Sequence, residues 1–140
     1  MPDVRPHAKL THEGALKILH AALAKAQEIR VPQCIAVTDD GGHLLAFVQM
    51  DGARRLSQRS AIRKAQTAAS NQAPTGGIPA ELEVKLALAT GGAVVNLKGG
   101  LPIVVDGQLV GAIGVGSGTQ DQDVEVARAG IAALSAATPV

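Results

Sequence analysis

The first regular pattern along the chain is a run of apolar residues at helical spacing. After Thr11 these residues recur at intervals of three and four and share one face of a helix. Thr11 is a suitable N-cap residue and Pro32 cannot continue a helix, so we expect a helix between them. The apolar positions are Ala15, Leu16, Ile18, Leu19, Ala22, Leu23, Ala26 and Ile29.

Shorter apolar runs predict β-strands. Cys34–Thr38 and His43–Met50 flank Asp39-Asp40-Gly41-Gly42, residues that tolerate positive φ, which indicates a hairpin. Three later runs cover Ala93–Leu97, Leu101–Val105 and Gln108–Val115, and Asp106-Gly107 between the last two is a strong hairpin signal. Because hairpin-joined strands pair antiparallel, we expect a five-stranded antiparallel sheet.

Further helices are predicted between and after these strands. Residues 56–70 and 81–89 contain good helix formers, and the loop between them concentrates glycine, proline and asparagine. A last helix is predicted from Gln120 to about Ala137, because Thr119 and Gln122 form a T-x-x-Q capping box. Strands joined by hairpins and covered by helices indicate an α+β fold.

Composition narrows the classes of function. The chain has 140 residues, the size of one domain, and a formal net charge of +1. Because this charge is small and only 18% of the residues are charged, no basic nucleic-acid surface is expected. Phe47 is the only aromatic residue, so no base-stacking platform is expected either. The chain shows no secretory signal and no apolar run of the ~18 residues that a membrane span needs. We therefore expect a cytoplasmic protein with no nucleic-acid or membrane partner.

The segment GAIGVGSGTQDQD, residues 111–123, tests a nucleotide-binding hypothesis. A dinucleotide fingerprint, G-x-G-x-x-G, fails because Thr119 stands at the third glycine position, and a P-loop fails because no lysine follows Gly118. One functional reading remains, in which the backbone N–H groups of Gly116, Ser117 and Gly118 bind a small anion at the start of the last helix. The alternative is a structural turn whose helix end is already occupied by Asp121 or Asp123.

Basic residues gather on or just before the second helix. Arg55, Arg59 and Arg63 share one helical face, and Arg54 and Lys64 lie beside them. Such a stripe is either a solvated surface or a site for an anion, since arginine binds carboxylates bidentately.

Long stretches of the chain resemble a known family. The stretches are LTHEGALKILHAALAKAQEIRVPQCIAVTDDGGHLLAFVQMDGA, KAQTAA and GGLPIVVDGQLVGAIGVGSGTQDQDVEVARAGIAAL, from about residue 10 to 134. They resemble the GlcG/HbpS family, whose domain also ends some corrinoid adenosyltransferases. The resemblance implies one domain over residues 1–140, a profilin-like three-layer fold, a homo-oligomer, and haem or corrinoid binding in some members. It also implies that Lys64 and Thr67 approach the ligand.

Haem binding would require an axial ligand and cations for the carboxylates. His43 opens the predicted second strand and is the candidate axial ligand if haem is bound; a histidine beside a glycine turn is also a common surface residue. The sequence contains neither an H-x-x-x-H nor an H-E-x-x-H motif, so no dedicated metal site is expected.

Two functions therefore remain open. The first is a module that binds a small anionic ligand, haem or a related tetrapyrrole by resemblance. The second is an enzyme acting on a small organic acid in a catabolic pathway, in which arginine or lysine anchors the carboxylate and Asp51 or Glu81 moves protons. The apolar content and the consecutive apolar residues 131–134 also predict a homo-oligomer.

Overall fold

A computed structural model describes residues 2–140. Its elements follow the order helix, two strands, two helices, two strands, helix. Their bounds are α1 (His12–Glu28), β1 (Cys34–Asp39), β2 (Leu44–Gln49), α2 (Ser57–Asn71), α3 (Ala80–Ala89), β3 (Gly100–Val105), β4 (Gln108–Gly116) and α4 (Gln120–Ala132).

The sheet has four antiparallel strands in the order β2-β1-β4-β3. Both predicted hairpins are present. In the β3–β4 turn Asp106 and Gly107 have φ values of 50° and 77°, the left-handed backbone that an Asp-Gly loop provides. The first and last strands of the sequence order, β1 and β4, pair at its centre, so residues far apart in the sequence form the middle of the sheet.

The expectation of a fifth strand at Ala93–Leu97 was wrong. This segment has no regular secondary structure and forms no ladder with a strand. Instead the carbonyl of Ala93 accepts a hydrogen bond from Thr67 Oγ1, and the N–H of Val95 donates one back to the same oxygen. A helix side chain therefore satisfies the backbone groups that a neighbouring strand would have used.

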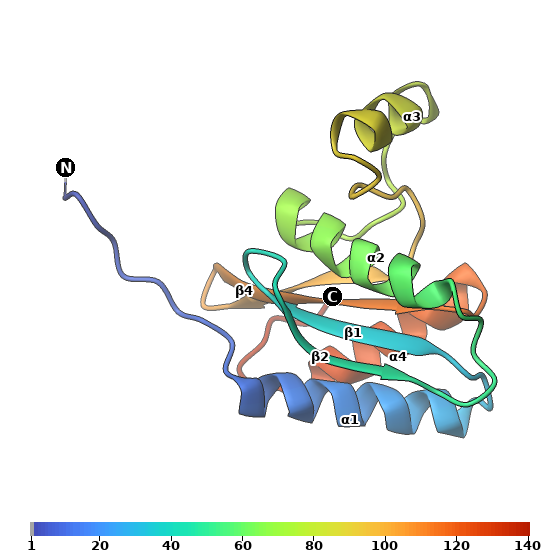
Figure 1. Ribbon diagram of the computed structural model, residues 1–140. Helices are drawn as coiled ribbons and strands as arrows, with labels where there is room; N and C mark the ends of the chain where they lie inside the picture. The colour runs from blue at the N-terminus through green and yellow to red at the C-terminus, as the bar shows by residue number, and fades with distance from the viewer. Residues whose placement is uncertain (1) are drawn as a thin grey trace.

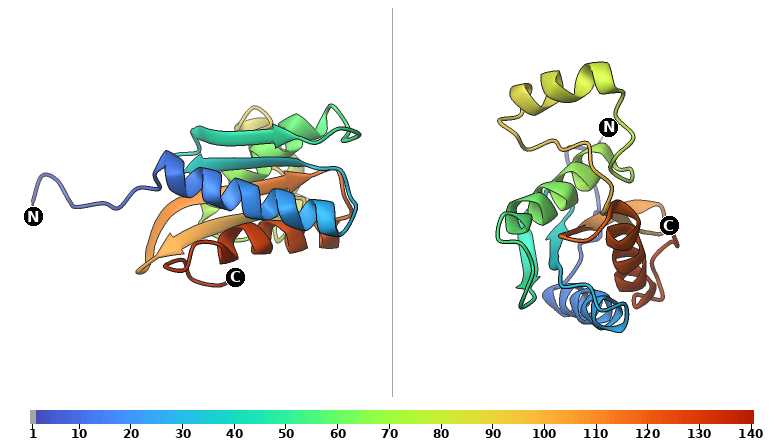
Figure 2. Two further views of the ribbon diagram at one scale, coloured as in Figure 1. Left: turned by 90° about the horizontal axis from the view of Figure 1, so that it is seen from below. Right: turned by 90° about the vertical axis from the view of Figure 1, so that its right-hand side faces the viewer.

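The elements form three layers (Figure 1). Helices α1 and α4 lie side by side on one face of the sheet, and α2 covers the other face, as the two views of Figure 2 also show. Helix α3 stands beyond α2, away from the sheet. The layered α+β arrangement agrees with the sequence, while its likeness to profilin stays a prediction.

The two faces of the sheet carry side chains of different size. The face toward α1 and α4 holds large aliphatic residues, including Ile35, Val37, Ile113 and Val115. The face toward α2 holds small ones, and it packs against alanines of the helix. The buried apolar residues of these clusters are Cys34, Ala36, Ala61, Ala65, Ala68, Ala69 and Ala112. Small residues on both sides let α2 lie close to the backbone of β4.

Helix α4 begins as predicted and ends earlier. The side chain of Thr119 accepts from the N–H of Gln122, and the Gln122 side chain accepts from the N–H of Thr119, which completes the capping box. The helix ends at Ala132 because the chain then turns back to the sheet, where Ala137 bridges to Val105.

Among the described residues no helix combines the length and apolar character needed to cross a bilayer.

Candidate functional site

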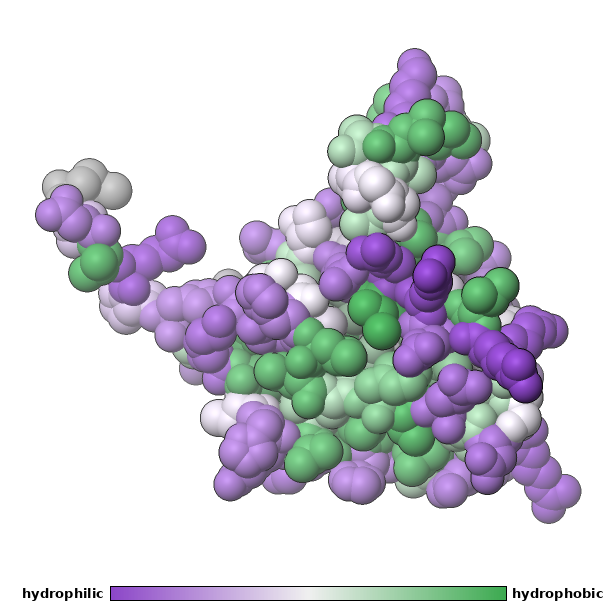
Figure 3. All heavy atoms as spheres, viewed as in Figure 1, coloured by the Kyte–Doolittle hydropathy of each residue, from purple (hydrophilic) through white to green (hydrophobic). Residues whose placement is uncertain are grey.

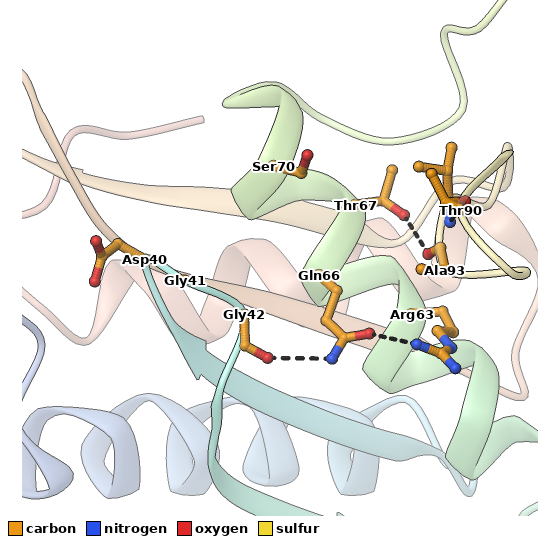
Figure 4. Close-up of a pocket in the computed structure, with 10 residues that line it drawn as sticks. Asp40, Gly41, Gly42, Arg63, Gln66, Thr67, Ser70, Thr90 and Ala93 are labelled. Carbon is orange, nitrogen blue, oxygen red and sulfur yellow. Dashed lines mark hydrogen bonds between the residues drawn. The ribbon is translucent and has the colours of Figure 1, made fainter. Parts of the chain in front are cut away.

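A hollow of about 470 Å³ lies between the β1–β2 turn, α2 and the segment that follows α3 (Figure 4). This volume falls within the range of small-molecule sites. Its polar wall comes from α2 and its apolar wall from the segment after α3. The lining residues are Asp40, Gly41, Gly42, Arg63, Gln66, Thr67, Ser70, Thr90, Ala93 and Val94.

A chain of hydrogen bonds crosses this hollow from the helix to the turn. Arg63 Nη1 donates to Gln66 Oε1 at 3.0 Å, and Gln66 Nε2 donates to the carbonyl of Gly42 at 3.2 Å (Figure 4). Gly42 has φ of +81°, a left-handed conformation that turns its carbonyl group toward α2. A guanidinium has five N–H donors, so Arg63 keeps donors for a bound carboxylate.

Thr67 is the residue of the predicted ligand set that the structure places in the wall of the hollow. It is buried, and its hydroxyl group joins α2 to Ala93 and Val95 as described above. Thr67 therefore lines the hollow and holds the segment after α3 in place.

His43 lies directly after the two glycines of the wall, and its side chain is 80% exposed. Its Nδ1 atom is 3.1 Å from both carboxylate oxygens of Asp39, while Asp39 Oδ1 also accepts from the backbone N–H groups of Gly41 and His43. Burial disfavours the charged form of Asp39, but these hydrogen bonds outweigh it and lower the pKa of its carboxyl group. The carboxylate orients the imidazole ring and leaves Nε2 directed away from it.

The lowered pKa of Asp39 predicts a loss of stability in acid. A folded-state pKa below the unfolded one contributes stability that is present above about pH 4 and is lost as the pH falls through the folded pKa. We expect Asp39→Asn to be less stable than the wild type by about 1 kcal/mol at pH 7, since two backbone donors keep only a neutral acceptor. Urea unfolding at several pH values should show this difference shrinking below pH 4. A difference that is the same at pH 7 and pH 3 would contradict it.

Lys64, predicted as a ligand residue, does not line the hollow. Its side chain is 4% exposed, and Nζ donates to Asp123 Oδ2 at 3.0 Å and to the carbonyl of Val115 at 2.8 Å. Lys64 thus joins α2, β4 and α4 by a buried ion pair.

Asp123 also occupies the position predicted for a bound anion. Its Oδ1 atom accepts from the N–H of Gly118 at 3.0 Å and from Gln33 Nε2 at 2.9 Å. Burial raises the pKa of Asp123 above its usual range, although Lys64 and the N–H of Gly118 act in the opposite direction. The carboxylate of Asp123 thus occupies the start of α4, as in the structural alternative to an anion site at this glycine turn.

The other two residues of the predicted anion turn contact α2 and the segment before it. Ser117 Oγ accepts from the backbone N–H of Arg54 at 2.9 Å. Gly116 ends β4 opposite Cys34, close to Ser57 and Ser60 of α2. None of residues 116–118 lines the hollow.

The remaining predicted residues lie on the surface. Arg55, in the turn before α2, and Arg59, on α2 one turn before Arg63, are both exposed. Asp51 and Glu81, the candidate proton carriers, are exposed in different parts of the chain and do not line the hollow. Their catalytic role stays a prediction. Within residues 2–140, no cluster of three His, Cys, Asp or Glu side chains is placed to hold a metal ion.

Most residues that line the hollow were not predicted from the sequence as site residues. Arg63 belonged to the predicted arginine stripe, and its position one turn beyond Arg59 was the available signal. Gln66 and Gly42 are 24 positions apart in the sequence, so no local sequence pattern predicts the hydrogen bond between them. Val94 joins the wall because its segment leaves the sheet.

Comparisons with known proteins identify the family of this chain. Residues 10–132 match the family model described as "Haem degrading protein HbpS-like". The chain belongs to the HbpS-like family. It is 39% identical to Protein GlcG of Escherichia coli strain K12 over 107 residues, which cover 76% of this chain and 80% of that protein.

Two solved structures extend the likeness of this HbpS-like chain to three dimensions. A doubly substituted HbpS of Streptomyces reticuli has a TM-score of 0.84 and 35% identity, over 96% of this chain and 92% of that one. A structure described as a PduOC:heme complex has a TM-score of 0.86 and 27% identity, over 95% of this chain and all of that one. The resemblance expected from the sequence is confirmed at the level of the family.

Proposed function

We propose that this protein binds haem, or a related anionic tetrapyrrole, at the hollow between α2 and the β1–β2 turn. The observation that carries the proposal is Arg63 in the wall of a hollow whose other wall, the β1–β2 turn, leads directly into His43, a histidine with its ring oriented by Asp39. His43 would supply Nε2 to the iron, and Arg63 would bind a carboxylate of the macrocycle. The likeness to the PduOC:heme complex and the family description support the choice of ligand.

The surroundings of His43 fit those of an iron ligand. Histidines that bind metals usually donate the proton of their other ring nitrogen to a carboxylate, which fixes the tautomer and raises the basicity of the ligand. Asp39 takes that position beside Nδ1 of His43. The backbone N–H groups of Gly41 and His43 hold the carboxylate in turn, so the ring orientation is fixed by the turn itself.

The walls of the hollow fit the rest of the macrocycle. Haem presents an apolar ring with two carboxylates at its edge, and Ala93 and Val94 supply apolar surface opposite the polar wall of α2. Phe47 packs with Ala53 and Ile62 on the α2 side of the sheet, so aliphatic side chains must provide most of the contact. We also propose that the protein acts as a homo-oligomer, which is supported by the apolar residues left exposed on α3.

A haem titration followed at the Soret band tests this site. We expect saturable binding near one haem per chain. Arg63→Ala should weaken it about tenfold, because a charge-assisted hydrogen bond contributes about 1.5–3 kcal/mol. His43→Ala should shift the Soret maximum as well as weaken binding, since it removes the iron ligand. Asp39→Asn should shift the band with a smaller change in affinity, because the ring stays but its orientation and basicity change.

His20→Ala is the matched control. His20 is exposed on α1, across the sheet from the hollow, so its loss should leave the titration unchanged. Saturable haem binding that neither His43→Ala nor Arg63→Ala alters would place the haem elsewhere. A failure of wild-type protein to saturate would rule out haem as the ligand.

A further inference from the structure

Helix α3 forms an arm that leaves the body of the protein. We define the arm as residues 78–96, because Asn96 closes its base by hydrogen bonds to the N–H and the carbonyl of Ile78. Figure 1 and the right-hand view of Figure 2 show the helix standing clear of the three layers. None of the residues of α3 is buried.

The arm exposes apolar side chains on two sides. Leu82 and Leu86 lie one turn apart on one face, and Val84 and Leu88 on another, with exposures of 42%, 37%, 65% and 79%. Figure 3 shows this apolar surface at the end of the arm. An isolated helix of 10 residues is marginal in water, and a helix that is apolar on several sides is normally buried. The arm therefore requires a covering surface that its own chain does not supply.

The charges of the arm indicate what that surface must be. Glu81 and Glu83 outnumber Lys85, so the helix is net acidic. Among the described residues neither glutamate forms an ion pair with a lysine or arginine; Glu83 accepts only from Asn96 Nδ2. The covering surface should be basic and partly apolar.

The outer face of α2 has these two properties. Arg59 and Arg63 lie one turn apart on it, Arg55 lies in the turn just before it, and none of the three forms an ion pair within residues 2–140. Leu56, 78% exposed, and the half-buried Ile62 fall between these arginines in the sequence. Figure 3 shows strongly hydrophilic residues beside apolar ones in the region of α2.

From this complementarity we infer that the arm of one copy packs on the outer face of α2 of a second copy, and that the exchange is reciprocal. An acidic, apolar arm and a basic, partly apolar helix on the same chain are the two halves of an isologous contact with twofold symmetry. A lipid surface is a poorer partner, because anionic headgroups attract basic helices and repel a net acidic one.

One consequence of this contact rests on the proposed function: the arm of the second copy would complete the ligand site. Arg63 belongs both to the hollow and to the face of α2 that the partner's arm covers. Arg55 and Arg59, predicted from the sequence as ligand residues, would instead bind the acidic residues of the arm. The arm of the second copy would lie across the hollow and exclude water from it.

Two charge-reversed proteins test the exchange by sedimentation velocity in the absence of haem. In the first, Glu81→Arg and Glu83→Arg make the arm basic; in the second, Arg55→Glu and Arg59→Glu make the α2 face acidic. Wild-type protein should sediment as a dimer or larger assembly, and each reversed protein should self-associate at least tenfold more weakly, since like charges would then face each other. An equimolar mixture of the two should recover the assembly, because both of its reciprocal contacts pair opposite charges.

Reversals on α1 are the matched controls. Glu13→Arg and Lys17→Glu change the same charges at exposed positions across the sheet, and they should leave sedimentation unchanged. Circular dichroism verifies that each variant is folded. Monomeric wild-type protein, reversed proteins that assemble normally, or a mixture that does not reassemble would each overturn the inference. Flotation of wild-type protein with anionic vesicles, abolished by Leu88→Gln, would assign the arm to a lipid surface instead.

The haem titration separates this result from that of the proposed function. If Arg55 and Arg59 bind the ligand rather than the arm, Arg55→Glu with Arg59→Glu would weaken haem binding while sedimentation stays as in the wild type. If the arm exchange is correct and haem is not the ligand, the charge-swapped mixture would reassemble although no Soret change saturates.

Discussion

Replacing Asp123 by alanine is expected to lower the free energy of unfolding by about 3–5 kcal/mol. The substitution leaves the ammonium group of Lys64 buried with only the carbonyl of Val115 as a partner. It also removes the acceptor for Gln33 Nε2 and the N–H of Gly118. Urea or guanidinium unfolding followed by circular dichroism measures the change. Lys64→Ala should cost a similar amount, because it leaves the carboxylate of Asp123 in the same buried position.

The double substitution Lys64→Met with Asp123→Leu separates the ion pair from the packing. Removing both charges avoids an unpaired buried ion, so this protein should be more stable than either single variant that leaves one ion behind. Asp121→Ala is the control, since Asp121 is exposed on the same helix and should change stability by less than about 0.5 kcal/mol. Losses measured for Lys64→Met and Asp123→Leu singly that add up in the double variant would show that the two residues act independently.

This ion pair could not be predicted from the sequence, whereas features formed by neighbouring residues could be. The capping box of α4 and the Asp-Gly hairpin depend on residues within a few positions of one another, and both were predicted correctly. Lys64 and Asp123 are 59 positions apart and meet because α2 and α4 pack on opposite faces of one sheet beside the end of β4. The resemblance placed Lys64 near a ligand, but it carries no information about which acid the side chain meets.

Contacts between residues far apart in the sequence also explain the errors in the predicted strands and site. Ala93–Leu97 has the apolar, β-branched pattern of a strand, yet the hydroxyl group of Thr67 binds its backbone, and a side chain on another element leaves no trace in that pattern. Arg63 could be found from helical spacing alone. That it faces a hollow while its neighbour Lys64 faces the core follows from which side of α2 packs on the sheet.

Helix α2 is held in that position by a glycine of β4, which gives the second large expected effect. A Cβ atom at Gly114 would overlap the carbonyl oxygen of Ala61 and crowd the amide nitrogen of Ala65, both in the backbone of α2. A backbone cannot rotate out of the way as a side chain does, so Gly114→Ala must push α2 off the sheet. Overpacking usually costs about 1–3 kcal/mol, and against a helix backbone we expect about 3 kcal/mol or more.

The displacement of α2 should also be visible at the site. Arg63 and Gln66 move with the helix, so the Gly114→Ala protein should bind haem more weakly than its loss of stability alone explains, at a temperature where it is fully folded. Gly77→Ala is the matched control: Gly77 has no atom within 4 Å of its would-be Cβ and no positive φ, so unfolding and haem binding should both stay within error of the wild type. A Gly114→Ala protein as stable as the Gly77→Ala protein would show that α2 does not rest on the backbone of β4, and the close packing that orients both Arg63 and Lys64 would then need another cause.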